Sequence, residues 1–165
     1  MPEHQLPTDP DTASATAKDA PSDVAAAPLE GISVSEPEDA LPRVTLADLP
    51  QAMHEACARA GWQGLMPVQS LAFPYLLEGR DIMVQSRTGS GKTGCYLLPM
   101  LPRLSADLKA PQALVLAPTR ELAVQVEREA ATLFAGTGIV TVAVYGGVGY
   151  KKQMDALRDG AQLIV

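Results

Sequence analysis

The chain has 165 residues, of which 47% are hydrophobic and only 4% aromatic, and its formal charge is -6. This length suits one domain of ordinary size and excludes two, and the composition favours an α/β core rich in Ala, Leu and Val over a β-sandwich. Cys57 and Cys95 are isolated in the sequence, so they support neither a disulfide framework nor a zinc site. Neither a signal peptide nor a membrane-spanning run is visible, so we expect a cytoplasmic protein without a membrane partner.

Residues 1–42 differ in composition from the rest of the chain. They contain nine acidic residues against one lysine, a net charge of -8, which leaves +2 on residues 43–165. Because they offer few large apolar side chains to offset the entropy of ordering, we expect a disordered acidic Ala/Pro-rich extension. A solvated linker is the default interpretation, and an acidic tail that discourages nonspecific binding of nucleic acid is the alternative. The mildly basic remainder does not exclude a nucleic-acid partner.

Two helices and a strand are expected next. Apolar residues recur at helical spacing from Leu49 to Ala60, and Gly61 follows where a C-terminal glycine belongs. A second helix is predicted from Pro67, a favoured first helical position, to a stop at Gly79. Residues 81–85 then form a short run that predicts a strand.

The following loop, residues 86–93, has the composition of a phosphate-binding loop. Its glycines allow backbone N–H groups and a helix N-terminus to converge on one anion. A lysine adds a charge for the β- and γ-phosphates, and a threonine places a hydroxyl where Mg²⁺ would sit. We expect all of these residues to bind nucleotide: Ser86, Arg87, Thr88, Gly89, Ser90, Gly91, Lys92 and Thr93. The general pattern has glycine where this chain has Ser86, and a plain glycine-rich turn is the alternative.

The rest of the chain alternates between helices and strands. A helix from Lys92, shortened by Pro99 and Pro102, precedes an apolar run at 113–116 that predicts a strand buried on both faces. A helix over 122–133, a strand over 140–145, a polar helix over 151–158 and a strand at 163–165 follow. This alternation predicts an α/β fold with an open parallel sheet covered by helices on both faces.

Three blocks, in this order and spacing, resemble the DEAD-box family of ATP-dependent RNA helicases. Residues 61–69, Gly-Trp-Gln-Gly-Leu-Met-Pro-Val-Gln, are similar to its Q motif; residues 86–93 are similar to its P-loop, and residues 118–123, Pro-Thr-Arg-Glu-Leu-Ala, match its motif Ia. Gly146-Gly147 stands where the family has its GG pair. The resemblance covers residues 43–165 and implies a RecA-like P-loop NTPase domain, truncated at its C-terminus.

The resemblance also implies roles for single residues. Lys92 and Thr93 would serve catalysis, with Thr93 holding Mg²⁺ through ATP, and Gln69 would read adenine by pairing its carboxamide with N6 and N7. Backbone contacts to RNA, independent of sequence, would come from Pro118, Thr119, Arg120, Gly146 and Gly147. For Gln69 a solvent-facing helix position is the alternative, and for Arg120 a surface residue paired with a nearby acid. Trp62 is interpreted as core.

Two positions depart from the family. Val44 stands where the family has a stacking phenylalanine, and Met66 where it has a threonine that would cap the helix starting at Pro67. The sequence therefore predicts relaxed selectivity for adenine.

The implied function is that of an ATP-dependent RNA helicase, of which this chain carries only the ATP-binding start of the first domain. The Asp-Glu-Ala-Asp block and the second RecA-like domain, both needed for activity, are not in the sequence, so we expect this chain alone to be inactive. A truncated non-catalytic module that binds nucleotide, RNA or protein is the alternative, and a different P-loop NTPase such as a DNA helicase is a third.

Overall fold

The computed structural model describes residues 38–165. Disorder was predicted for residues 1–42, and residues 1–37 of that range lie outside the described residues. Residues 38–42 belong to the described part, and Asp39 and Leu41 among them contact Arg80 and Tyr75. The described structure thus begins before the predicted boundary at residue 43. Within it, no helix combines the length and the apolar character needed to cross a bilayer.

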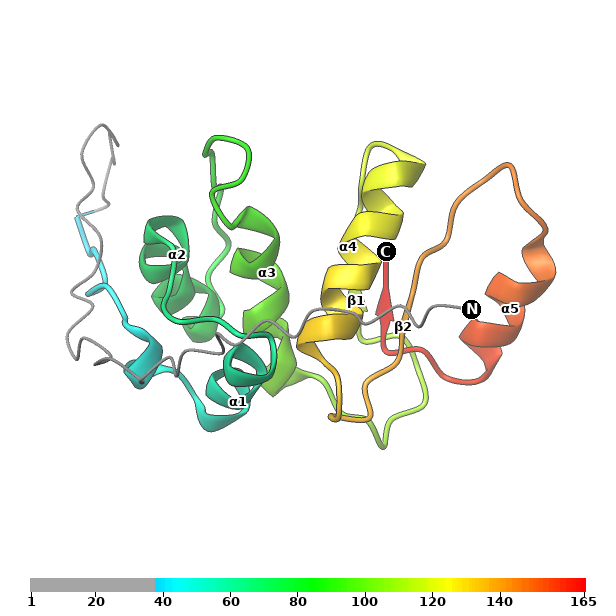
Figure 1. Cartoon of the computed structure of the whole chain (residues 1–165), viewed down its shortest axis with the longest axis horizontal. Coiled ribbons are helices and arrows are strands. Elements are labelled where there is room, and N and C mark those ends of the chain that lie inside the picture. Colours follow the sequence, from blue (N-terminus) through cyan, green and yellow to red (C-terminus); the bar gives the residue numbers. More distant parts are fainter. Residues whose placement is uncertain (1–37) are drawn as a thin grey trace, which may run out of the picture.

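The helices lie close to their predicted positions. After the 3-10 turn η1 (Leu46–Asp48), α1 covers Gln51–Arg59 and α2 covers Pro67–Glu78. Helix α3 (Lys92–Met100) continues into the 3-10 turn η2 (Leu101–Arg103), and α4 (Arg120–Leu133) and α5 (Tyr150–Arg158) follow. Gly79, at the end of α2, has a φ of 82°, which is the left-handed conformation expected of a C-terminal glycine. Figure 1 shows α2, α3, α4 and α5 following one another across the molecule.

Three short parallel strands form the sheet. They are β1 (Ala113–Leu114), β2 (Thr141–Val142) and β3 (Leu163–Ile164), arranged in the order β1-β3-β2. Leu163 of β3 is paired with Ala113 on one side and Thr141 on the other. The predicted parallel sheet flanked by helices is confirmed, although the strands are shorter than predicted.

One buried side chain fixes the start of this sheet. Gln162 is fully buried, and its Oε1 accepts from the backbone N–H of Val140 while its Nε2 donates to the carbonyl of Leu108. Its own backbone carbonyl accepts from Gln112 and Ala113. Because each polar group is paired, Gln162 joins the starts of all three strands without an unsatisfied buried group.

The strand predicted over residues 81–85 does not form. The segment is irregular, and Met83 is 97% exposed. Among the described residues, none of its backbone groups is hydrogen-bonded to a strand. A strand exists only when a neighbour accepts and donates its ladder hydrogen bonds, and β1, β2 and β3 bond only to one another.

The prediction that residues 113–116 are buried on both faces is also wrong. Ala113, Val115 and Ala117 pack against the core, whereas Leu114 and Leu116 are 62% and 85% exposed. This alternation is that of a strand with one covered face. The outer face of β1, at the edge of the sheet, has no described element packed over it.

The core lies between the helices and the inner face of the sheet. Phe73 of α2, Leu97 and Leu98 of α3, and Leu133 of α4 are almost completely buried in one cluster. Trp62 packs against this cluster, which confirms its interpretation as a core residue. The burial of α3 and α4 against each other holds the loop before α3 in a fixed place relative to the start of α4.

Candidate functional site

The predicted phosphate loop leads directly into α3. Gly89 and Gly91 have φ values of 77° and 90°, a conformation that costs other residues steric energy. Helix α3 begins immediately afterwards at Lys92, and its first turn contains no acidic residue. The N–H groups of this first turn have no partners within the helix, so the site presents positive potential to an anion.

Lys92 spans the loop. Its Nζ atom donates to the carbonyl oxygens of Ser86 and Arg87, each at 2.6 Å. These hydrogen bonds fold the loop around the ammonium group. Phosphate oxygens could replace the two carbonyl oxygens as its partners, since both kinds of acceptor are oxygens at hydrogen-bonding distance.

Two hydroxyl groups lie at the same place. Ser90 Oγ is buried and has no hydrogen-bond partner among the described residues, which leaves it available to a ligand. Thr93 interacts with Glu129 of α4 and with Tyr96 one turn along α3. Burial raises the pKa of Glu129, and the Thr93 side chain acts in the opposite direction. The set of loop amides, a lysine, the unpaired Ser90 hydroxyl and the Thr93 hydroxyl fits a nucleotide phosphate with its Mg²⁺.

Gln69 contacts the loop. This side chain is only 2% exposed; its Oε1 accepts from the backbone N–H of Met66 at 2.9 Å, and its Nε2 donates to the carbonyl of Gly91 at 3.1 Å. The first bond satisfies a free N–H at the start of α2, as the glutamine of a capping box does. The solvent-facing alternative is therefore wrong. These two bonds leave one lone pair of the oxygen and one N–H of the nitrogen for a contact with adenine.

The two positions that depart from the family lie on either side of Gln69. Val44 is partly buried, its N–H donates to the carbonyl of Ser70 at 3.2 Å, and its carbonyl accepts from Ser70 Oγ. Met66 is 43% exposed, and its Cγ would be 3.0 Å from a Cβ atom added at Gly91. The sulfur side chain thus lies against the phosphate loop, where a threonine would be shorter and polar.

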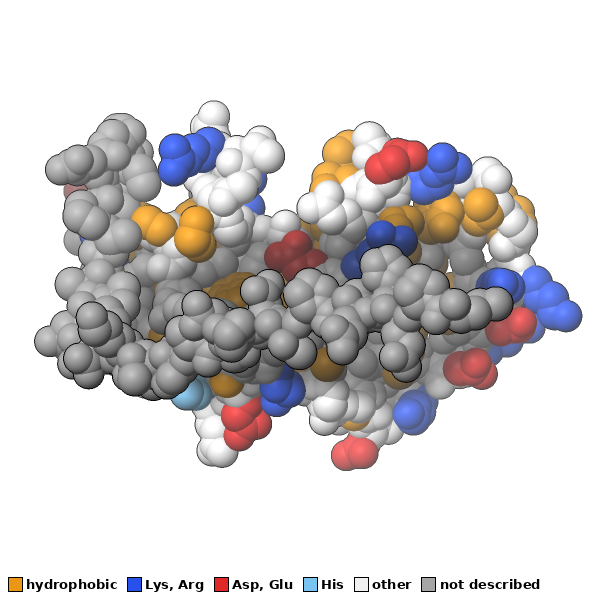
Figure 2. Space-filling view, viewed as in Figure 1, with side chains coloured by type: hydrophobic (Ala, Val, Ile, Leu, Met, Phe, Trp, Pro, Cys, Tyr) orange, Lys and Arg blue, Asp and Glu red, His pale blue; other side chains and the backbone are white. Residues whose placement is uncertain are grey.

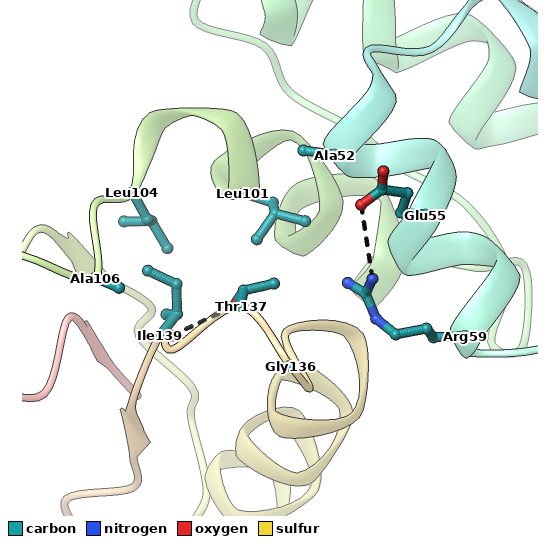
Figure 3. A pocket seen from close by; sticks show the side chains of 9 residues that line it. All are labelled: Ala52, Glu55, Arg59, Leu101, Leu104, Ala106, Gly136, Thr137 and Ile139. Carbon is teal, nitrogen blue, oxygen red and sulfur yellow. Dashed lines mark hydrogen bonds and ion pairs between the residues drawn. The ribbon is translucent and has the colours of Figure 1, made fainter.

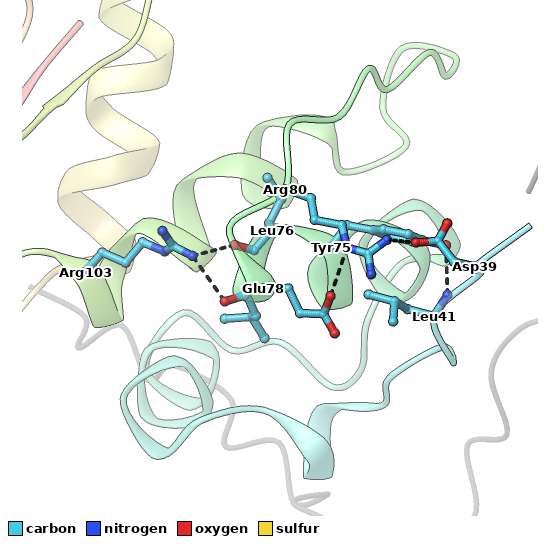
Figure 4. Close-up of polar contacts among 8 residues, drawn as sticks. Asp39, Leu41, Tyr75, Leu76, Glu78, Arg80 and Arg103 are labelled. Atoms are coloured by element: carbon cyan, nitrogen blue, oxygen red, sulfur yellow. Dashed lines mark hydrogen bonds and ion pairs between the residues drawn. The ribbon is translucent and has the colours of Figure 1, made fainter. Parts of the chain in front are cut away.

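A network at the end of α2 holds the segment that carries Val44. Figure 4 shows Arg80 next to Asp39 and Glu78, with its guanidinium carbon 5.6 Å from the centre of the Tyr75 ring. Tyr75 Oη accepts from the N–H of Leu41 at 3.0 Å. The Arg80 guanidinium holds the pKa of the Asp39 carboxyl below its usual value. Sequence reasoning missed this network because it joins residues about 40 positions apart.

The predicted RNA-contacting residues form a second group. Thr119 caps α4, its Oγ1 accepting from the N–H of Leu122 at 3.2 Å, and Arg120 pairs with Glu121 at 3.2 Å on the surface. The Arg120 guanidinium lies near the glycine pair, because its Nη1 would be 4.0 Å from a Cβ added at Gly147. Pro118, Gly146 and Gly147 are exposed. The structure thus brings Arg120 and Gly147 together, and it also shows the acidic partner considered for Arg120.

Both groups lie at one end of the molecule. In Figure 1 the loop before α3, the start of α4 and the loop before α5 all lie at the top. The carboxyl ends of parallel strands meet at such an edge, where open α/β sheets bind their ligands. A cavity of about 240 Å³ elsewhere, between α1, η2 and the loop after α4, contains none of the predicted site residues (Figure 3).

Comparison with known proteins identifies the family. A profile of the DEAD/DEAH box helicase family matches residues 66–165. The ATP-dependent RNA helicase DeaD of Escherichia coli K12 is 50% identical over 113 residues, covering 67% of this chain and 18% of the relative. The DEAD-box ATP-dependent RNA helicase CshC of Bacillus cereus is 39% identical over 120 residues, covering 73% of this chain and 31% of the relative.

Solved structures show the same relationship. A DEAD box protein from Methanococcus jannaschii has a TM-score of 0.65 and 30% identity, covering 72% of this chain and 32% of that one. The RNA helicase Prp28 from Chaetomium thermophilum bound to ADP has a TM-score of 0.65 and 36% identity, and the match covers 80% of this chain and 32% of Prp28. The chain thus spans a third or less of these relatives. On its sequence and its RecA-like fold, it belongs to the DEAD/DEAH box helicase family.

Proposed function

We propose that residues 43–165 are the ATP-binding beginning of an ATP-dependent RNA helicase, in which RNA stimulates ATP hydrolysis and hydrolysis drives local separation of RNA duplexes. The observation that carries this proposal is the loop at 86–93, where the Lys92 ammonium group is held by the loop carbonyls directly at the start of α3. The names of the relatives support it, and one of them, Prp28, is described as bound to ADP.

The nucleotide-binding residues have distinct roles in this proposal. The backbone N–H groups of residues 86–93 bind the phosphates, and Lys92 transfers its hydrogen bonds from Ser86 and Arg87 to the β- and γ-phosphates. The Thr93 hydroxyl holds Mg²⁺, which supplies positive charge beside the phosphates when it is bound with ATP. Gln69 reads adenine with the lone pair and the N–H that its bonds to Met66 and Gly91 leave unused.

The RNA contacts involve the second group of residues. Pro118, Thr119 and Arg120 at the start of α4, with the backbone of Gly146 and Gly147, contact phosphates along one strand. Phosphate contacts fix the position of the strand and do not read its sequence. Phosphoryl transfer also needs an acid that holds the metal, a group that orients water, and cations from a second RecA-like domain. In this proposal all three come from parts of the protein outside residues 1–165.

The test is RNA-stimulated ATP hydrolysis by the full-length protein that carries this segment. Lys92→Ala should abolish stimulated hydrolysis, because it removes the charge that binds the β- and γ-phosphates. Lys109→Ala is the matched control, since Lys109 is an exposed lysine outside both groups of predicted site residues and should leave the rate unchanged. An unchanged rate in Lys92→Ala, or no stimulation by RNA in the unsubstituted protein, would contradict the proposal.

A further inference from the structure

The surface around the start of α5 combines features that none of the predicted roles uses. Tyr150, the first residue of α5, is 71% exposed, and Val148 before it is 42% exposed. No residue of α5 is buried, so this helix contributes little to the core. Figure 2 shows hydrophobic and basic side chains close together over the end of the molecule that carries α5.

The charge of this surface is positive. Helix α5 carries Lys151, Lys152 and Arg158 against one acid, Asp155, and the acid pairs with Arg158 at 3.9 Å. Among the described residues, neither lysine forms an ion pair. Two exposed lysines that follow an exposed aromatic residue in the first turn of α5 suit a ligand that has both negative charges and flat apolar faces.

A hollow of about 470 Å³ lies beside these residues, lined by Tyr145, Val148, Gly149, Lys151, Lys152 and Gln153. Its wall is held in place by a pair of hydrogen bonds, because the Gln153 carboxamide accepts from the N–H of Tyr145 at 3.1 Å and donates to its carbonyl at 3.2 Å. The loop with Gly146 and Gly147 is therefore clamped to α5. A strand that contacts Arg120 and Gly147 needs only to continue along this clamped loop to reach Tyr150.

We propose that the start of α5 binds the continuation of the single-stranded RNA, with a base stacked on Tyr150 and adjacent phosphates contacting Lys151 and Lys152. This inference rests on the proposed RNA binding and extends it from phosphate contacts to a base contact. Stacking on an aromatic ring is tolerant of sequence, since every base has a π-face. The surface therefore adds affinity for unpaired bases and leaves double-stranded RNA, whose bases are already stacked, at a disadvantage.

The test compares RNA affinities by fluorescence anisotropy, with the full-length protein that carries this segment and a short single-stranded RNA. Tyr150→Ala should weaken binding by roughly 5- to 100-fold, whereas Tyr150→Phe keeps the ring and should bind as the unsubstituted chain does. The unsubstituted chain should bind an RNA with abasic sites more weakly than the intact RNA. With the abasic RNA, the unsubstituted chain and Tyr150→Ala should have the same affinity. Since Tyr150 is exposed, circular dichroism should show that the variants keep their helices.

The lysines have a separate readout. The slope of the logarithm of the RNA association constant against the logarithm of the salt concentration is negative. Its magnitude should decrease by about 0.7 in each of Lys151→Gln and Lys152→Gln, the value for one phosphate contact to a single strand. If the unsubstituted chain binds no RNA, the proposed function fails along with this inference. If neither Tyr150→Ala nor abasic sites weaken RNA binding, the inference alone is overturned, as expected if this surface instead receives a protein.

Discussion

Gln69 links the start of α2 to the phosphate loop. The Gln69 side chain bridges Met66 and Gly91, so the carboxamide that reads adenine in this proposal also supports the loop that binds phosphate. A base bound at Gln69 would share the Nε2 amide group with the carbonyl of Gly91. Base recognition and phosphate binding are thereby coupled through one side chain.

Selectivity for adenine is the first prediction at this scale. Val44 offers no aromatic face and Met66 no hydroxyl, so ATP should outcompete GTP by less than in relatives with phenylalanine and threonine at these positions. The measurement is a competition titration against a fluorescent nucleotide. The double variant Val44→Phe, Met66→Thr should raise the preference for ATP, and a strict ATP preference in the unsubstituted chain would refute the prediction.

Gly94 gives the second residue-scale prediction. A Cβ atom at Gly94 would lie 2.5 Å from the Trp62 ring and 3.0 Å from Gln69 Nε2, and both neighbours are held by the core. Gly94→Ala should therefore lower the free energy of unfolding by roughly 1–3 kcal/mol, the usual cost of overpacking. Chemical denaturation measures the change. Gly64→Ala, where a Cβ would meet nothing within 4 Å, is the control, and equal midpoints for the two variants would contradict the account.

At the scale of elements, the helices were predictable because their signals are local. Pro67 and Gly79 mark the ends of α2, and Gly91 and Lys92 the start of α3, within a turn of the residues they affect. Three of the four predicted strands also form, although they are shorter than predicted, and the fourth does not, because a strand depends on partners elsewhere in the chain. Residues 81–85 have strand composition and no strand neighbour among the described residues.

The same distinction holds for the site. The phosphate loop was predicted from adjacent residues, and its two glycines have the left-handed conformation on which that prediction depends. The contacts of Gln69 with Gly91, of Thr93 with Glu129 and of Arg80 with Asp39 join separate elements, and no periodicity or spacing indicates them. The resemblance to a family located Gln69, and the structure shows which partners it has.

The thiols of α1 and α3 give a prediction on pH. Cys57 and Cys95 are buried, and burial raises the pKa of each thiol from 9.0 to about 11. A raised pKa means that the folded chain holds these protons more tightly than the unfolded chain. The contribution of the two thiols to the free energy of unfolding is therefore fully present below pH 9 and is lost as the pH rises toward 11. The loss should be roughly 2 kcal/mol per thiol. Unfolding midpoints measured from pH 8 to pH 11 should fall less steeply in a Cys57→Ala, Cys95→Ala variant; parallel curves would contradict the prediction.

At the scale of the whole molecule, the described part is an unclosed sheet. The order β1-β3-β2 leaves β1 at an edge, with Leu114 and Leu116 exposed, and the segment before the phosphate loop lies outside the sheet. Exposed edges and apolar side chains of this kind favour association with other chains. The RecA-like relatives, of which this chain spans a third or less, contain further chain that residues 38–165 do not supply.

The 165-residue chain alone should therefore bind ATP weakly and hydrolyse it at a negligible rate. The reason is that, in the proposed function, the metal-holding acid, the water-orienting group and the second-domain cations come from outside residues 1–165. Phosphate release measured with RNA present should not exceed that of Lys92→Ala. Turnover above that control would show that residues 1–165 contain the catalytic groups.

The central claim is that the loop at 86–93 binds the phosphates of ATP, and NMR of the backbone amides tests it most directly. Titration with Mg²⁺ and ATP should move the N–H resonances of Gly89, Ser90, Gly91, Lys92 and Thr93 together, with Gln69 following through its bond to Gly91. Lys92→Ala should remove these shifts. Shifts confined to another site, such as the cavity between α1 and η2, with no change from Gly89 to Thr93, would contradict the account.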